Sequence, residues 1–166
     1  MKLFFSLLSL LFLATFAQVQ ATTVIAPTFD QLVDEADVIF QGKVTALQSQ
    51  WTGEGAQRVI VTFVTFQVED AMKGNPGQRY TVRMLGGTVD GQTIEIADAP
   101  KFTVGDRDLL FVERNGSQFI PLVGVMHGRF HVQRDQAGHE SVLTNDGKQV
   151  DGLSEFKAAI RQKLQR

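Results

Sequence analysis

The amino-acid sequence predicts an all-β fold, a small closed barrel with a short helix near each end. Apolar and polar residues alternate over residues 38–47 and 79–84, which is the two-residue period of a half-buried β-strand. Asp90-Gly91 and Asn115-Gly116 are dipeptides that favour the tight turns of β-hairpins. Apolar residues recur at helical spacing only near the two ends of the chain. The pattern therefore indicates a curled sheet with a few extra hairpins and two terminal helices.

The start of the chain has the features of a secretory signal peptide. Lys2 precedes an apolar run of 15 residues, 3–17, and Val19 and Ala21 place small residues where a signal peptidase reads them. A membrane anchor is the competing interpretation, but a helix needs about 20 apolar residues to span a bilayer. We therefore expect residues 1–21 to be removed on export.

Removal of the signal peptide defines the mature protein. Cleavage after residue 21 leaves residues 22–166 as a single domain in a secreted or periplasmic location, with no membrane contact. It also creates a free α-amine at Thr22. Cleavage after Ala17 is the alternative.

Composition excludes two classes of function. Without Lys2 the chain has 15 Lys and Arg against 18 Asp and Glu, a net charge of −3 with neutral histidines. A surface of that charge offers no basic field for phosphates, so we expect no nucleic-acid partner. The chain contains no cysteine, which excludes disulfides and thiol chemistry.

The first part of the mature chain predicts a helix followed by a bent strand. Thr28 and Gln31 have the spacing of a capping box, so we expect a helix over Phe29–Glu35. The strand over residues 38–47 contains Gly42 at its middle. Glycine inside a strand predicts a bulge or a sharp bend, as closed barrels need at their corners.

The rest of the chain predicts more strands and one further helix. Residues 58–70 are apolar on both faces, so this strand is covered on both sides or passes from one sheet into another. Breakers at 73–77 end it, and Phe130 and Val132 mark a later strand. A final helix begins behind Ser154, the expected N-cap, and its apolar residues have helical spacing. They are Leu153, Phe156, Ile160 and Leu164.

The histidines do not predict a metal site in this chain. His127 and His131 lie four residues apart in a predicted strand and therefore share a face. Arg129 lies between them on that face, and its fixed positive charge opposes a bound cation. We expect a solvated polar face there, with His127 partly buried as the alternative.

The remaining polar residues do not predict an enzyme or a cofactor. The chain has no Gly-x-Ser-x-Gly motif, and Gly86-Gly87 lacks the strand-to-helix setting of a phosphate loop. Paired carboxylates occur at 34–35, 69–70 and 106–108, beside predicted turns or helix ends. Solvation and helix capping explain such pairs better than acid–base chemistry.

Trp51 is the residue that most suggests binding. It is the only tryptophan of the chain and lies in the polar segment 48–57 between two long predicted strands. An aromatic side chain on a mobile loop is a common binding anchor, and folding back onto the barrel is the alternative.

Several segments resemble the tissue inhibitors of metalloproteinases (TIMPs). Mature TIMPs open with a short extended ridge and a helix, followed by an Ala/Ser-Asp-hydrophobic-hydrophobic step into the first strand. Ala36-Asp37-Val38-Ile39 matches that motif here. It begins 14 residues after Thr22, which is the same distance from the first mature residue as in the family. Residues 66–74 are similar to the long strand of TIMPs with its Lys-Gly turn, and residues 105–112 to a later strand.

The resemblance implies an OB-like Greek-key barrel and a function in protease control. In TIMPs the α-amine and carbonyl of the first mature residue chelate the catalytic zinc of the protease, and the second side chain enters its specificity pocket. By position, Thr22 is the zinc chelator and Thr23 the pocket residue. The flanking ridge consists of Val24, Ile25, Ala26 and Pro27. The resemblance thus implies a secreted inhibitor or modulator of a zinc metalloprotease, although TIMPs carry cysteines where this chain has Thr22 and Val24.

A non-catalytic OB-like module is the alternative function. Such a module would bind an oligosaccharide, a peptide or a cell-envelope partner through one barrel face, using Trp51 and either Tyr80 or Arg83. OB barrels bind many kinds of ligand, so the fold class alone does not choose between these functions.

Overall fold

The computed structural model describes residues 26–166. The predicted signal peptide, its cleavage site and residues 22–25 of the predicted inhibitory ridge lie outside the described residues. Within them the chain is mostly β with two α-helices, which confirms the predicted class. Neither helix is long and apolar enough to cross a membrane.

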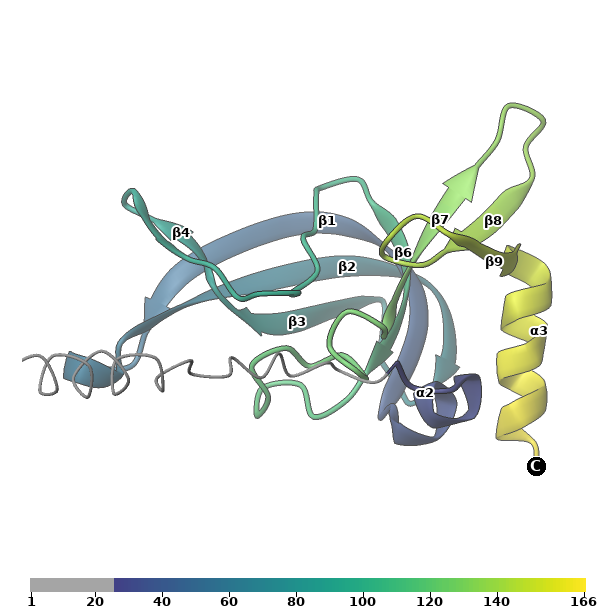
Figure 1. Cartoon of the computed structure of the whole chain (residues 1–166), viewed down its shortest axis with the longest axis horizontal. Helices are drawn as coiled ribbons and strands as arrows, with labels where there is room; N and C mark the ends of the chain where they lie inside the picture. Colours follow the sequence, from purple (N-terminus) through teal and green to yellow (C-terminus); the bar gives the residue numbers. More distant parts are fainter. Residues whose placement is uncertain (1–25) are drawn as a thin grey trace, which may run out of the picture.

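One antiparallel sheet of seven strands organises the described chain (Figure 1). Its strand order is β3-β2-β1-β6-β7-β8-β9, and a separate hairpin, β4-β5, follows β3. The strands are β1 (Val38–Thr52), β2 (Val59–Lys73), β3 (Arg79–Leu85), β4 (Gly87–Val89), β5 (Gln92–Ile94), β6 (Arg107–Val112), β7 (Arg129–Arg134), β8 (Glu140–Leu143) and β9 (Gln149–Gly152). The helices are α2 (Phe29–Glu35) and α3 (Leu153–Leu164), and a 3-10 turn, η1 (Gly55–Gln57), joins β1 to β2. β3 and β9 end the sheet, so strand pairing does not close it.

β1 and β2 are long strands that bend together across the molecule (Figure 1). Their pairing slips at three points, one of which lies between Gln41 and Gly42. Each slip adds twist and bend to the strand, so the bulge predicted at Gly42 is confirmed. A Cβ atom at Gly42 would lie 2.8 Å from the carbonyl oxygen of Gln67, because the backbone of β2 passes close by.

β6 separates two hydrophobic cores. Leu109 and Phe111 face the core that α2 and α3 cover, whereas Leu110 and Val112 face the core enclosed by β1, β2 and β3. All four side chains are fully buried. A strand with two buried faces needs cover on both sides, and the loop over residues 95–102 helps to cover the second face.

The capping box predicted for α2 is confirmed. Thr28 Oγ1 accepts a hydrogen bond from Gln31 N at 3.2 Å, and Gln31 Oε1 accepts one from Thr28 N at 2.9 Å. At the other end of the helix, Lys73 Nζ donates to the carbonyl oxygens of Val33 and Asp34 at 2.8 and 3.0 Å. Both ends of this seven-residue helix are therefore satisfied by side chains.

α3 begins two residues earlier than predicted. Its N-cap is Gly152, so the prediction of Ser154 is wrong; β9 runs directly into the helix, and Leu153 is already buried at its start. Asp70 on β2 ties the helix to the sheet through Lys157 at 2.5 Å and Arg161 at 2.7 Å. Burial acts to raise the pKa of Asp70, but the hydrogen bonds and charges of these two partners outweigh it and lower that pKa.

The Asn115-Gly116 segment forms a docked turn rather than the predicted tight hairpin. The Asn115 carboxamide donates to the carbonyl oxygen of Thr81 at 2.8 Å and accepts from Arg83 N at 3.0 Å. Both of these backbone groups lie on the outer edge of β3. The carboxamide therefore replaces one peptide group of a neighbouring strand.

The chain that follows this turn links β3 to β6. Leu85 N donates to the carbonyl oxygen of Phe119 at 2.7 Å, and Val112 forms an isolated antiparallel bridge with Leu122. Residues 119–122 thus lie between the ends of β3 and β6 without forming a regular strand.

Arg129 on β7 is the largest fully buried side chain of the described residues. Its Nε donates to Asp108 at 3.1 Å and its Nη2 to Asp106 at 2.9 Å, and Asp108 is itself 0% exposed. The guanidinium also bonds to the carbonyl oxygen of Lys101 and lies 4.0 Å from the Phe102 ring centroid. The expectation that the 106–108 carboxylates are simply solvated is therefore wrong, because they neutralise a buried cation.

The Arg129–Asp108 pair gives a test of this packing. We expect Asp108→Leu to lower the free energy of unfolding by about 3–5 kcal/mol, because it leaves a buried guanidinium short of a counter-charge. The double variant Asp108→Leu with Arg129→Met should recover most of that loss, since it removes both charges. Urea denaturation of Asp108→Leu, Arg129→Met and the double variant measures the difference. A double variant as unstable as the sum of its single substitutions would contradict the coupling.

Candidate functional site

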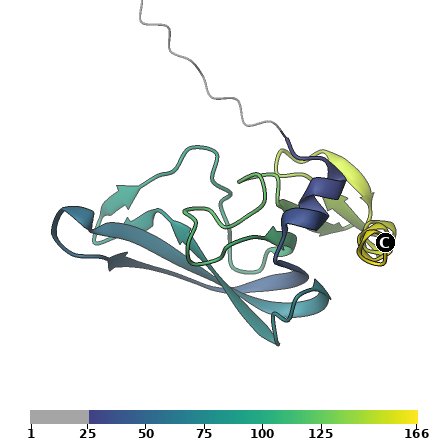
Figure 2. The ribbon, with the colours of Figure 1, turned by 90° about the horizontal axis from the view of Figure 1, so that it is seen from below.

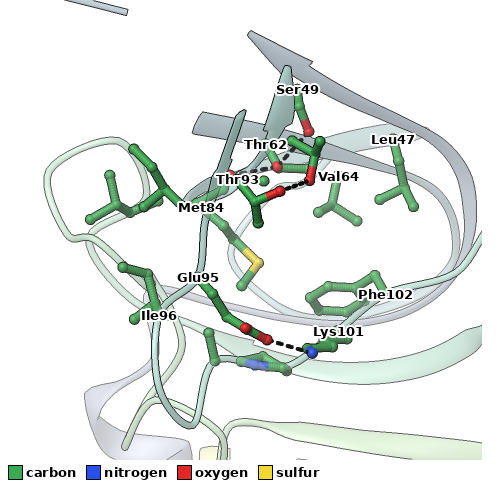
Figure 3. A pocket seen from close by; sticks show the side chains of 17 residues that line it. Leu47, Ser49, Thr62, Val64, Met84, Thr93, Glu95, Ile96, Lys101 and Phe102 are labelled. Carbon is green, nitrogen blue, oxygen red and sulfur yellow. Dashed lines mark hydrogen bonds and ion pairs between the residues drawn. The ribbon is translucent and has the colours of Figure 1, made fainter. Parts of the chain in front are cut away.

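A cavity of about 370 Å³ lies between the sheet and the β4-β5 hairpin (Figure 3). Its floor comes from β1, β2 and β3, and its opposite wall comes from the hairpin and the loop over residues 95–102. Its apolar lining consists of Leu47, Val64, Met84, Leu85, Ile94, Ile96, Ala99, Pro100 and Phe102. Ser49, Thr62, Thr88 and Thr93 add hydroxyl groups, and Glu95 and Lys101 contribute the only ionisable side chains of this lining.

The hydroxyl groups at the cavity bind one another and the backbone. Thr62 Oγ1 donates to the carbonyl oxygen of Gly86 at 2.7 Å and lies 2.8 Å from Ser49 Oγ. Thr88 and Thr93 pair across the hairpin at 2.8 Å. These side chains are therefore satisfied, and the cavity presents mainly apolar surface.

Gly87 allows the hairpin to cross the sheet at this point. A Cβ atom there would collide with Thr62 Oγ1 and Ser49 Oγ, and the residue has φ +130°. Only glycine adopts that conformation readily. The Gly86-Gly87 pair therefore serves a close backbone crossing at the inner end of the cavity.

Glu95 and Lys101 form an ion pair at the rim of the cavity, with 2.6 Å between Oε1 and Nζ (Figure 3). The hydrogen bond and charge of Lys101 lower the pKa of Glu95, and Glu95 raises the pKa of Lys101 in return. Both side chains are exposed, so the pair marks the entrance and leaves the apolar interior uncharged.

The buried Arg129 cluster holds the outer wall of the cavity. Phe102 lies between the Arg129 guanidinium and the Phe66 ring, whose centroid is 5.6 Å from that of Phe102. Arg129 also donates a hydrogen bond to the carbonyl oxygen of Lys101, which fixes the backbone next to Phe102. The wall is thus anchored to β2 and β7 although it contains no regular secondary structure.

Trp51 lies in β1 and not on the predicted mobile loop. β1 extends to Thr52, because Trp51 pairs with Ile60 of β2. Strand alternation places Trp51 on the face of Leu47 and Ser49, which line the cavity. The Arg58 guanidinium stacks 4.5 Å from its ring centroid.

The described part of the predicted N-terminal ridge packs against the turn before β7. The Pro27 ring contacts Gly124, where a Cβ atom would lie 2.8 Å from Pro27 Cδ. Ala26 is exposed. This segment lies apart from the cavity, which none of its residues lines.

The other residues singled out from the sequence do not join the cavity. Tyr80 packs in the core, 5.3 Å from the Phe40 ring centroid, and Arg83 binds Asn115 through its backbone. His131 Nδ1 lies 3.0 Å from Asp108, and His127 falls in the turn before β7 rather than in a strand. The described residues contain no cluster of three or more His, Asp or Glu suited to a metal ion.

Sequence reasoning missed the cavity itself. Its wall at 95–102 has no strand or helix period, so no pattern predicted that Phe102 and Ala99 would cover β1–β3. One sequence signal could have predicted this wall. The segment after Ile94 mixes apolar residues with turn formers and is too apolar for a solvated loop.

No protein-family model matches this chain, and comparisons with curated proteins and with solved structures find no significant match either.

The Thr62 hydroxyl gives a test of how the hairpin is held over the cavity. We expect Thr62→Val to lower the free energy of unfolding by about 1–2 kcal/mol, because the Gly86 carbonyl loses its donor. Thr65→Val on the same strand is the matched control, since that hydroxyl pairs with Thr81 on an exposed face. Equal losses in thermal or urea denaturation would contradict the role assigned to Thr62.

Proposed function

We propose that this protein is a non-catalytic binding module that holds an apolar group of its ligand in the cavity over β1, β2 and β3. The observation that carries the proposal is the preformed apolar cavity. Its volume of about 370 Å³ is within the range of roughly 300–1,000 Å³ that ligand pockets occupy. Its outer wall is anchored by a buried arginine, so little ordering is needed on binding.

The proposal includes an OB-like architecture. The strand order β3-β2-β1-β6-β7 and the link from β3 through residues 119–122 to β6 support a Greek-key barrel completed by an irregular segment. Ligands of OB folds bind on the face of the second and third strands. The cavity lies over the corresponding strands of this chain.

The chemistry of the lining favours an apolar ligand group over an oligosaccharide. A sugar requires several free hydrogen-bonding partners, but the four hydroxyl side chains here are already paired. It also favours binding over catalysis, because no histidine lines the cavity and Glu95 is neutralised by Lys101.

A pair of substitutions in the cavity wall tests the proposal. Ala99→Phe places a ring in the cavity, whereas Ala97→Phe adds the same ring to an exposed position of the same loop. We expect Ala99→Phe to weaken binding of anilinonaphthalene sulfonate by about tenfold or more and Ala97→Phe to leave it unchanged. The measurement is the probe's fluorescence, which rises in apolar surroundings.

Two results would contradict the binding proposal. One is the absence of saturable probe binding to the folded wild-type protein. The other is equal binding by Ala99→Phe and Ala97→Phe at unchanged melting temperature, which would place the probe elsewhere.

We propose inhibition of a secreted zinc metalloprotease as the second candidate function. The observation that favours it is the support given to the chain directly after residues 22–25. Pro27 packs on Gly124, and the capping box at Thr28 begins a helix with both ends satisfied. Inhibition through a free amine requires such a rigid support for the first mature residues.

A single added residue tests the second candidate. Inhibition of a panel of zinc metalloproteases by protein that begins at Thr22 should disappear when one alanine precedes Thr22, because the α-amine is then displaced from the zinc. Trp51→Ala should leave inhibition unchanged and serves as the control. Full inhibition by the extended protein would rule out the zinc-chelating function.

A further inference from the structure

The distal half of β1 has an open edge beside the cavity. β1 pairs with β6 only as far as Lys43, and Val44 then exchanges backbone hydrogen bonds with Gly105 and Asp106. Residues 46–52 pair with β2 on one side. Among the described residues, no strand pairs with their other side.

The residues that face this edge also line the cavity or continue its floor. After the bulge between Val44 and Ala46, strand alternation turns the backbone N–H and C=O groups of Leu47, Ser49 and Trp51 away from β2. The side chains of Leu47 and Ser49 line the cavity. A strand added here would therefore direct alternate side chains to the cavity side.

In the described part of the chain, the outer edges of β3 and β9 are protected, but the open edge of β1 is not. Asn115 and Phe119 bond to the outer edge of β3, and β9 is four residues long and carries Asp151. Residues 46–52 contain neither a charge nor a proline, the usual devices against edge pairing. Figure 2 shows the β4-β5 hairpin standing above one face of the sheet, so it does not replace the missing strand in the plane of β1.

Exposed apolar and cationic side chains mark the two ends of the open edge. Leu47 is 39% exposed and Val104, next to Gly105, is 58% exposed, so both present apolar surface at this end of the edge. At the far end, Arg58 stacks on Trp51 and forms no ion pair with any described residue. An acidic group there would complement its charge.

We propose that the ligand is an extended peptide that pairs as an additional strand with residues 46–52 of β1, inserts an apolar side chain into the cavity and places an acidic residue beside Arg58. This inference rests on the proposed binding function and names its ligand class. Main-chain hydrogen bonds supply affinity in such β-augmentation, and pockets for alternate side chains supply specificity.

Backbone methylation of a probe peptide tests the pairing directly. The probe is a synthetic peptide that alternates isoleucine and threonine and ends in aspartate, and its binding is measured by the change in fluorescence of Trp51, the only tryptophan. Two further peptides carry N-methyl groups either on the isoleucine or on the threonine amides. One methylated set should weaken binding by about tenfold or more, because it blocks the paired edge, and the other should bind much as the parent does.

A matched pair of variants tests the protein side. Leu47→Ala and Leu47→Pro both remove the side chain, but only proline removes the backbone donor on the open edge. We expect Leu47→Pro to bind the probe peptide about tenfold more weakly than Leu47→Ala, at a similar melting temperature. If Leu47→Pro does not fold, the methylated peptides decide the question.

The possible failures can be told apart. Equal binding of the parent and both methylated peptides would overturn strand pairing while leaving the cavity proposal intact. If the protein still binds anilinonaphthalene sulfonate but does not bind the peptide, strand pairing is likewise overturned and the cavity proposal stands. Concentration-dependent dimerisation in analytical ultracentrifugation that Leu47→Pro abolishes would overturn the peptide in favour of a second copy of this chain.

Discussion

The buried guanidinium of Arg129 is the interaction on which the rest of the structure depends. It joins β7 to β6 through Asp108, and it joins both strands to the loop that forms the cavity wall through Lys101 and Phe102. A cation without solvent is costly unless it is fully paired, so these partners must all be in place at once. The network therefore couples the order of an irregular loop to the order of the sheet.

The bend of β1 and β2 determines where a cavity forms. If the sheet were flat, β1 and β2 would keep one face toward each of the two hydrophobic cores along their whole length. The bulges near Gly42 and Ala46 instead turn the distal half of β1 away from β6, so the pairing of β1 with β6 ends at Lys43. Among residues 26–166, this turn leaves a stretch of β1 without a neighbouring strand on one side and gives the hairpin β4-β5 room above its face.

Elements with local signals were predictable from the sequence, whereas elements held by distant contacts were not. α2, the bulge at Gly42 and the turn at Asp90-Gly91 depend on residues close in sequence, and all three occur as expected. Asn115 looked like a hairpin residue, but Thr81 and Arg83 bind its side chain from more than 30 positions away. The cavity depends on contacts of that second kind, so its wall left no periodic signal.

The two candidate functions use different segments of the chain and different interactions. Zinc chelation would depend on the residues ahead of Pro27 and on the rigidity of α2, which follows them. Peptide pairing would depend on the distal half of β1, where no strand of the described chain pairs with the backbone groups beside the apolar cavity. An unprotected neutral edge invites aggregation, and the rest of this sheet avoids that hazard through Asn115 and short terminal strands. The retention of one open edge where the apolar cavity lies is more consistent with a binding surface than with an incidental end of the sheet.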